Sequence, residues 1–132
     1  MRLPVLIASL LCLSASPSFA EAGSRQPFRI FFDWSKPELT RDAMATLDEV
    51  VEAYQRDKPP LIGIAGHSDR SGPLAVNLAA SRRRADAVKA YLVGRGIPAG
   101  VMAVSAYGES RPIVPTEDGV REAQNRRVEI SF

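Results

Sequence analysis

The sequence predicts an α+β sandwich in which two helices pack on one face of a mixed four-stranded sheet. Two long segments carry apolar residues at three- and four-residue spacing, which is typical of amphipathic helices. Shorter runs rich in β-branched and aromatic residues precede, separate and follow these segments. The last run, residues 127–132, alternates charged and apolar side chains, as expected of a strand with one face in water. The expected order is therefore β-α-β-α-β-loop-β.

Residues 1–20 are typical of a secretory signal peptide that is cleaved after Ala20. Arg2 supplies the positive charge, residues 3–15 supply the apolar run, and small residues stand at Ser18 and Ala20, before the cleavage point. The alternative is an uncleaved membrane anchor, but the apolar run is shorter than the roughly 20 residues that cross a bilayer. We therefore expect an exported protein of the periplasm.

The exported chain is expected to be nearly neutral and free of cysteine. Removing Arg2 leaves 16 basic residues against 15 acidic ones, so no strong field attracts nucleic acid. Cys12 lies in the signal segment and lacks the small preceding residue that lipoprotein processing needs, so we expect no lipid anchor. We also expect no membrane span. Residues 21–27 are expected to form a short exposed segment, and residues 28–132 a single domain with one core.

The first half of the domain is predicted to form a strand, a helix and a second strand. Residues 28–32 form a β-type run, which ends at the proline-containing turn 33–37. Thr40 is expected to cap a helix that ends at residues 58–60. The predicted buried stripe of this helix consists of Met44, Leu47, Val50, Val51 and Tyr54. Residues 61–65 form the second predicted strand.

The second half is predicted to begin with a longer helix over residues 73–93, which ends at the glycine-containing stretch 94–96. Its predicted buried face consists of Leu78, Ser81, Ala85, Val88 and Leu92. A third strand is expected at residues 101–107. The polar stretch 109–124 is predicted to be a loop, in which Thr116 caps one short turn of helix.

An acid and a base on two different elements form the candidate binding pair. Asp69 follows the strand at 61–65, and Arg84 lies fifteen positions later on the longer helix. At about 100° per residue, Arg84 lies beside the buried face, whereas Arg82 and Arg83 are rotated roughly 200° and 100° away from Arg84. We therefore expect Arg84 alone to lie near Asp69. Arg82 and Arg83 are interpreted as an ordinary solvated helix face.

Two interpretations of the pair remain open. A ligand that carries an ammonium and a carboxylate on one carbon would give its carboxylate to the guanidinium of Arg84 and its ammonium to Asp69. The alternative is a salt bridge between Asp69 and Arg84 that only fixes the helix to the loop, which would contribute about 0 to 1 kcal/mol if exposed.

Asp33 and Trp34 are candidates for the opposite wall of the same pocket. This holds if strands 28–32 and 61–65 are neighbours that run in the same direction. Asp33 is equally typical of a turn-forming acid that accepts hydrogen bonds from its own backbone, and Trp34 could equally be a core or a lid residue. Asn77 is a secondary candidate, because an amide there more commonly braces a loop or packs a helix.

The sequence offers no catalytic constellation. His67, Ser68 and Asp69 are consecutive, and consecutive residues of an extended segment point to opposite faces, so they cannot form a nucleophile, base and acid relay. The sequence has no G-x-S-x-G motif and no glycine-rich phosphate loop. A single histidine without a nearby cysteine is a poor transition-metal site. We expect no enzymatic activity, no cofactor and no metal, and a structural, hydrogen-bonded role for His67.

Several blocks together resemble the OmpA-like peptidoglycan-binding domain family, which includes the OmpA C-terminal, Pal and MotB types. The resemblance covers residues 28–132 and implies a non-catalytic fold that holds the diaminopimelate residue of the peptidoglycan stem peptide. By motif position, it implies that Asp69 and Arg84 are the ligand-binding groups. The matching blocks are Gly66-His67-Ser68-Asp69, Gly72, Asn77, Ser81, Arg84-Ala85, Tyr107-Gly108-Glu109, Pro112-Ile113 and Asn125-Arg126-Arg127-Val128-Glu129.

The chain also departs from the family pattern. Val76 stands where the family commonly has an aromatic residue, Ala80 stands where leucine is usual, and Ser68 replaces a more frequent threonine. The expected function is a peptidoglycan-binding module that associates itself, or a membrane-anchored envelope protein, with the cell wall, and that reaches the outer membrane through such a partner. The alternative is an interaction subunit of an envelope complex, which keeps the fold and turns the Arg84 surface toward an acidic protein.

Overall fold

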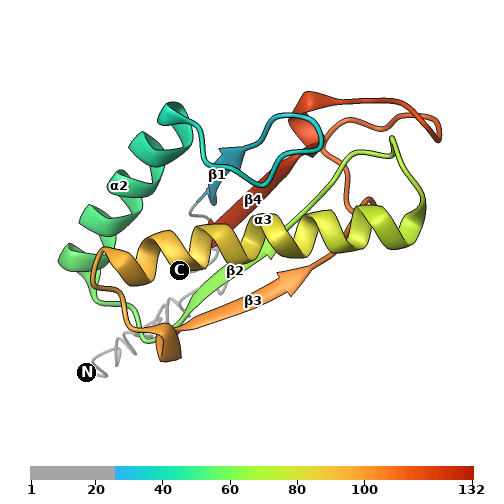
Figure 1. Cartoon of the computed structure of the whole chain (residues 1–132). Coiled ribbons are helices and arrows are strands. Elements are labelled where there is room, and N and C mark those ends of the chain that lie inside the picture. Colours follow the sequence, from blue (N-terminus) through green and yellow to red (C-terminus); the bar gives the residue numbers. More distant parts are fainter. Residues whose placement is uncertain (1–25) are drawn as a thin grey trace, which may run out of the picture.

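The computed structural model describes residues 26–132, which form two helices and a four-stranded sheet (Figure 1). The signal peptide predicted for residues 1–20, with its cleavage site and Cys12, lies outside the described residues, as does most of the segment 21–27. Within residues 26–132, no helix combines the length and the apolar character that a membrane crossing requires.

The sheet has the strand order β1-β4-β2-β3 and is mixed. Its strands are β1 (Phe28–Phe31), β2 (Ile62–Gly66), β3 (Met102–Ala106) and β4 (Arg127–Ser131). β4 is antiparallel to β1 and to β2, whereas β2 and β3 are parallel. β1 and β2 therefore run in the same direction, as supposed from the sequence, but they are not neighbours, because β4 lies between them. The predicted fold class and element order are confirmed.

Helix α2 (Arg41–Asp57) begins and ends where the sequence predicts. The side chain of Thr40 accepts a hydrogen bond from the backbone N–H of Ala43 at 3.1 Å, and Lys58 ends the helix in a left-handed conformation. Leu47, Val50 and Tyr54 are buried as predicted, but Met44 and Val51 are only half-buried. Ala43 and Ala53 take the remaining buried positions, because small side chains allow closer packing there.

Helix α3 (Leu74–Gly94) packs on β2, β3 and β4, on the same face of the sheet as α2 (Figure 1). Its buried residues are Asn77, Ser81, Arg84, Ala85, Val88 and Leu92. The prediction of a buried Leu78 is wrong, because this side chain is 50% exposed. Gly108 explains the difference: a Cβ on Gly108 would lie 3.2 Å from the Cα of Leu78, so backbone packs against backbone and the leucine side chain points away.

A close approach between Gly66 and Ser81 sets the position of α3. A Cβ on Gly66, the last residue of β2, would lie 2.0 Å from the carbonyl oxygen of Ser81. The hydroxyl of Ser81 donates to the carbonyl of Leu78 at 2.7 Å and accepts from the backbone N–H of Gly108 at 3.0 Å. Helix α3 is thereby fixed to the ends of β2 and β3, three residues before Arg84.

The polar stretch before β4 is held by two side chains. The amide of Asn125 accepts from the backbone N–H groups of Ile113 and Val114 at 2.8 and 2.9 Å, and donates to the carbonyl of Val114 at 2.8 Å. The guanidinium of Arg70 donates to the carbonyl of Thr116 at 2.9 Å. The short helix predicted at Thr116 is absent, because this contact holds the segment against the loop after β2. The two short 3₁₀ turns lie instead at η1 (Ala99–Val101) and η2 (Ala123–Asn125).

Substituting Gly66 should test the contact that positions α3. We expect Gly66→Ala to lower the free energy of unfolding by about 1 to 3 kcal/mol or more, because its Cβ must displace backbone atoms of Ser81. Gly100→Ala is the matched control, since a Cβ there meets no atom within 4 Å, and its change should stay within about 0.5 kcal/mol. Urea unfolding followed by circular dichroism measures both, and equal effects would contradict the assignment.

Candidate functional site

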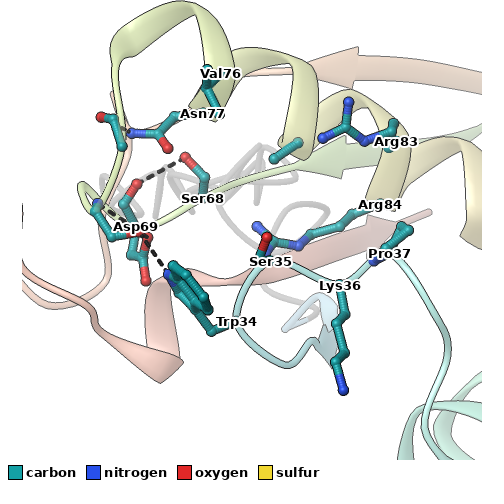
Figure 2. Close-up of a pocket in the computed structure, with 13 residues that line it drawn as sticks. Trp34, Ser35, Lys36, Pro37, Ser68, Asp69, Val76, Asn77, Arg83 and Arg84 are labelled. Carbon is teal, nitrogen blue, oxygen red and sulfur yellow. Dashed lines mark hydrogen bonds between the residues drawn. The ribbon is translucent and has the colours of Figure 1, made fainter.

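The candidate site is a small pocket at the end of β2 (Figure 2). Its walls are the turn at residues 34–37, the loop at residues 68–72 and the N-terminal half of α3. The cavity measures about 110 Å³, well below the roughly 300 to 1,000 Å³ of sites that enclose a whole small molecule, so it can hold only one end of a larger ligand. Four of the residues predicted from the sequence line it, namely Trp34, Asp69, Asn77 and Arg84.

Asp69 is buried and its two carboxylate oxygens are fully hydrogen-bonded. Oδ1 accepts from the backbone N–H of Ser71 at 3.2 Å and from its hydroxyl at 2.6 Å. Oδ2 accepts from the backbone N–H of Glu122 at 3.2 Å and from the guanidinium of Arg126 at 3.0 Å. A carboxylate has about four acceptor positions, so the protein itself already satisfies this one. The salt-bridge partner of Asp69 is therefore Arg126, not Arg84.

These contacts determine the charge state of Asp69. Burial raises the pKa of its carboxyl, but hydrogen bonds from Ser71, Arg126 and Glu122 outweigh burial and bring the pKa below its usual value. Asp69 is consequently ionised at neutral pH. Arg126 also donates to the carbonyl of Phe32 at 3.1 Å, so the ion pair connects the end of β1 to the loop after β2.

Arg84 is buried to the same degree as Asp69, and its hydrogen-bonding capacity is mostly unused. One guanidinium nitrogen donates to the carbonyl of His67 at 3.3 Å, and the buried Nε has no partner within residues 26–132. The guanidinium lies 5.7 Å from the ring centre of Phe32. Burial lowers the pKa of Arg84, and Asp69 opposes this effect. A buried cation with vacant donors is costly unless a ligand or water satisfies it.

Trp34 ties the opposite wall to Asp69 through Ser71. The indole N–H donates to the hydroxyl of Ser71 at 3.1 Å, and this hydroxyl in turn donates to Asp69 (Figure 2). Trp34 has a second side-chain contact: the guanidinium of Arg121 lies 3.5 Å from the centre of the indole ring. Trp34 is 44% exposed, so it is a wall of the pocket and not a core residue.

The structure does not place Asp33 on this pocket. The carbonyl of Asp33 accepts from the backbone N–H of Lys36 at 3.3 Å, and Ser35 adopts a positive φ of 58°. The chain therefore turns immediately after Asp33, and the four residues that follow reach the pocket. Asp33 lines a separate groove beside the N-terminus of α2. The prediction that Asp33 forms the opposite wall of the pocket is therefore corrected: Trp34 lines the pocket and Asp33 does not.

Asn77 braces the loops around the site, which is one of the two roles that the sequence suggested for it. Its amide nitrogen donates to the carbonyl of Gly72 at 2.8 Å and to the carboxylate of Glu109 at 2.9 Å. These bonds join the first turns of α3 to the loop after β2 and to the loop after β3. Asn77 therefore shapes the pocket that it lines.

Sequence reasoning missed Arg126, Ser71 and Arg83. Arg126 reaches Asp69 only because β4 lies next to β2, which no local pattern indicates. Arg83 is exposed, as predicted, but its side chain also lines the pocket. Neighbouring residues of a helix are rotated by about 100°, and a side chain as long as arginine can cover that arc. Arg82, by contrast, is an exposed partner of Asp86 at 3.3 Å.

His67 lies behind the pocket and takes no part in a relay. It is buried and stacks on Tyr107 with ring centres 5.5 Å apart. Burial, followed by the charge of Arg127, lowers its pKa to about 4, so the imidazole is neutral at neutral pH. The expectation of a hydrogen-bonded His67 is wrong within residues 26–132, because neither ring nitrogen has a partner there. Aromatic stacking holds the ring instead.

Comparisons with known proteins agree on one family. The sequence profile of the OmpA family matches residues 31–126. A peptidoglycan-associated lipoprotein of Rhizobium meliloti is 39% identical over 114 residues, which cover 82% of this chain and 65% of that protein. An outer membrane protein of Gluconacetobacter diazotrophicus is 39% identical over 109 residues, or 78% of this chain and 29% of that protein. The chain thus spans less than two thirds of both curated relatives.

Solved structures are similar in fold. The crystal structure of the peptidoglycan-associated lipoprotein from Burkholderia pseudomallei superposes with a TM-score of 0.71 at 25% identity, over 80% of this chain and 88% of that one. The C-terminal domain of Helicobacter pylori MotB gives a TM-score of 0.68 at 24% identity, over 81% of this chain and 83% of that one. The mixed sheet with its two helices is therefore the fold of these domains.

Arg126→Gln should destabilise the domain and change the titration of Asp69. Removing one partner of a buried ion pair costs roughly 3 to 5 kcal/mol, and we expect the lower end because three other donors to Asp69 remain. In the wild type the folded pKa of Asp69 lies below the ordinary 3.8, so its contribution to stability is present above that pH and is lost as pH falls through the folded pKa. The variant should show a higher pKa.

Chemical denaturation measures the first effect, and carboxyl-carbon NMR titration measures the second. Arg82→Gln is the control, because Arg82 belongs to an exposed pair and its loss should change stability by less than about 0.5 kcal/mol. An unchanged pKa of Asp69 in Arg126→Gln would mean that this ion pair does not hold the carboxylate ionised.

Proposed function

Because this chain belongs to the OmpA family, we propose that it is a non-catalytic, peptidoglycan-binding protein of the periplasm that holds the free end of diaminopimelate. The observation that carries the proposal is Arg84, a buried guanidinium with vacant donors on the wall of a pocket that also contains Asp69. A free amino-acid end carries one carboxylate and one ammonium. In the cell wall, the side-chain end of diaminopimelate has both of these groups.

Arg84 takes the carboxylate of the ligand. A planar guanidinium binds a carboxylate through two parallel hydrogen bonds, and each charge-assisted bond contributes roughly 1.5 to 3 kcal/mol. The partnerless Nε and the weak bond to His67 leave Arg84 free to make both. Because Asp69 forms its ion pair with Arg126, no direct salt bridge to Asp69 occupies Arg84.

Asp69 takes the ammonium, and one of its present donors must give way. The backbone N–H groups of Ser71 and Glu122 are fixed by the chain, and Arg126 is held by a second bond to Phe32. The hydroxyl of Ser71 rotates freely about one bond, so the ammonium replaces this donor at Oδ1. Trp34 donates to the same hydroxyl and follows its movement.

The size of the pocket limits both the contact area and the affinity. Only the end of the diaminopimelate side chain enters, and the rest of the peptide and the sugars stay outside. The ordering cost of association removes much of the energy of two ionic contacts, so we expect binding in the micromolar to millimolar range, on the order of 4 to 8 kcal/mol. Association with the outer membrane would depend on a partner protein.

Substituting Arg84 tests the proposal. Arg84→Ala should weaken cosedimentation with purified peptidoglycan sacculi by about 2 to 5 kcal/mol, since the carboxylate of the ligand would lose the guanidinium that binds it. Free meso-diaminopimelate should displace the wild type from the sacculi. Arg84→Lys, which keeps the charge but loses the planar fork, should retain part of the binding.

The matched control is Arg82→Ala, two residues away on the same helix and outside the pocket. It removes the same charge and should cosediment like the wild type. Circular dichroism of every variant separates lost binding from lost folding. If the folded Arg84→Ala variant and the wild type cosediment equally, the proposed function is wrong.

A further inference from the structure

The charges that line the pocket do not balance. Its lining contains one acid, Asp69, and three bases, Lys36, Arg83 and Arg84. Asp69 already forms an ion pair with Arg126, which lies behind it. A ligand with one ammonium and one carboxylate therefore leaves an excess of positive charge at the mouth of the pocket. The excess attracts a second anionic group.

Arg83 is the cation best placed to bind that group. Within residues 26–132 its side chain has no hydrogen-bond or ion-pair partner, whereas the neighbouring Arg82 pairs with Asp86. Figure 2 shows the Arg83 side chain on α3 at the edge of the pocket, apart from the guanidinium of Arg84. The ammonium of Lys36, in the same view, points away from Arg84.

The surface between the pocket and Arg83 is open. Val76, Ala80 and Arg83 follow one another at four- and three-residue spacing, so they form one stripe along α3. Val76 and Ala80 have short side chains, and both line the pocket. A ligand that leaves the pocket beside Asn77 meets no bulky side chain on this stripe before it reaches Arg83.

We propose that Arg83 binds a second carboxylate of the same stem peptide, carried by the residue next to diaminopimelate. This inference rests on the proposed function. In a stem whose glutamate is linked through its side-chain carboxyl, the α-carboxylate of that glutamate is free and lies one residue from diaminopimelate. The pocket and the stripe together then select a peptide with two carboxylates over a single amino acid. Amidation of the glutamate α-carboxyl removes the second charge and weakens binding.

Calorimetric titration of the intact protein with two synthetic dipeptides tests this selectivity. The first is γ-D-glutamyl-meso-diaminopimelate in which the diaminopimelate carboxyl beside the peptide bond is amidated, so that it carries two free carboxylates. The second is the same compound with its glutamate α-carboxyl amidated as well. A largely exposed ion pair contributes up to about 1 kcal/mol, so the wild type should bind the first about fivefold more tightly. Arg83→Gln should bind both with the affinity that the wild type shows for the amide.

The controls separate this inference from the proposed function. Arg82→Gln removes a charge one residue away and should keep the fivefold difference, whereas Arg84→Ala should bind neither dipeptide. Raising the salt concentration should reduce the difference for the wild type, because an exposed pair is screened. Arg83 is on the surface, so its loss should leave folding intact.

Three results would overturn the inference. If the wild type binds both dipeptides equally while Arg84 is still required, Arg83 has no such role and the proposed function stands. If Arg82→Gln abolishes the difference as fully as Arg83→Gln, only general electrostatic attraction is present. If the wild type binds neither dipeptide nor sacculi, the proposed function is wrong and the inference falls with it.

Discussion

The buried carboxylate of Asp69 is the interaction on which the pocket depends. Its four hydrogen bonds join the loop after β2, through Ser71, to the segment before β4, through Glu122 and Arg126. Through Ser71 they also reach Trp34 on the opposite wall. An ionised carboxylate is stable in the interior only when its acceptor positions are filled. Three segments that are distant in sequence are therefore held together by one side chain.

The same arrangement keeps Arg84 available. The buried Arg84 and the partly buried Arg126 lie near one acid, and the acid bonds directly to Arg126. Arg84 makes one long hydrogen bond and keeps a buried Nε without a partner, although an unsatisfied buried donor costs roughly 1 to 3 kcal/mol. The close packing of Gly66 on Ser81 fixes α3 only three residues away from Arg84. The fold thus maintains a donor that only a ligand or water can satisfy.

Local sequence patterns predicted the helices and strands, whereas the features that the sequence did not predict depend on how distant strands pair. Helix ends such as Thr40 follow from backbone hydrogen bonds within a few residues, so the sequence specifies them. Asp69 and Arg84 were predicted to lie close together because strand ends and helical phase are also local properties, and both line the pocket. Arg126 was missed because its place depends on β4 lying between β1 and β2, and Asp33 was misplaced because a positive φ at Ser35 turns the chain. Periodicity indicates which face a residue occupies, not which strand lies beside it.

The pocket is suited to a ligand that is part of a polymer. A cavity of about 110 Å³ admits one end of a side chain, so recognition is confined to a few charges and the buried area is small. Such a contact is weak and reversible by itself, because the cost of association consumes much of its energy. A polymer that repeats the same end many times raises the effective concentration of sites around a protein that has just dissociated. If Arg83 adds a second charge contact at the rim, it increases selectivity at each site without making release slow. Retention would then come from the density of the polymer, and discrimination from the positions of two arginines on one helix.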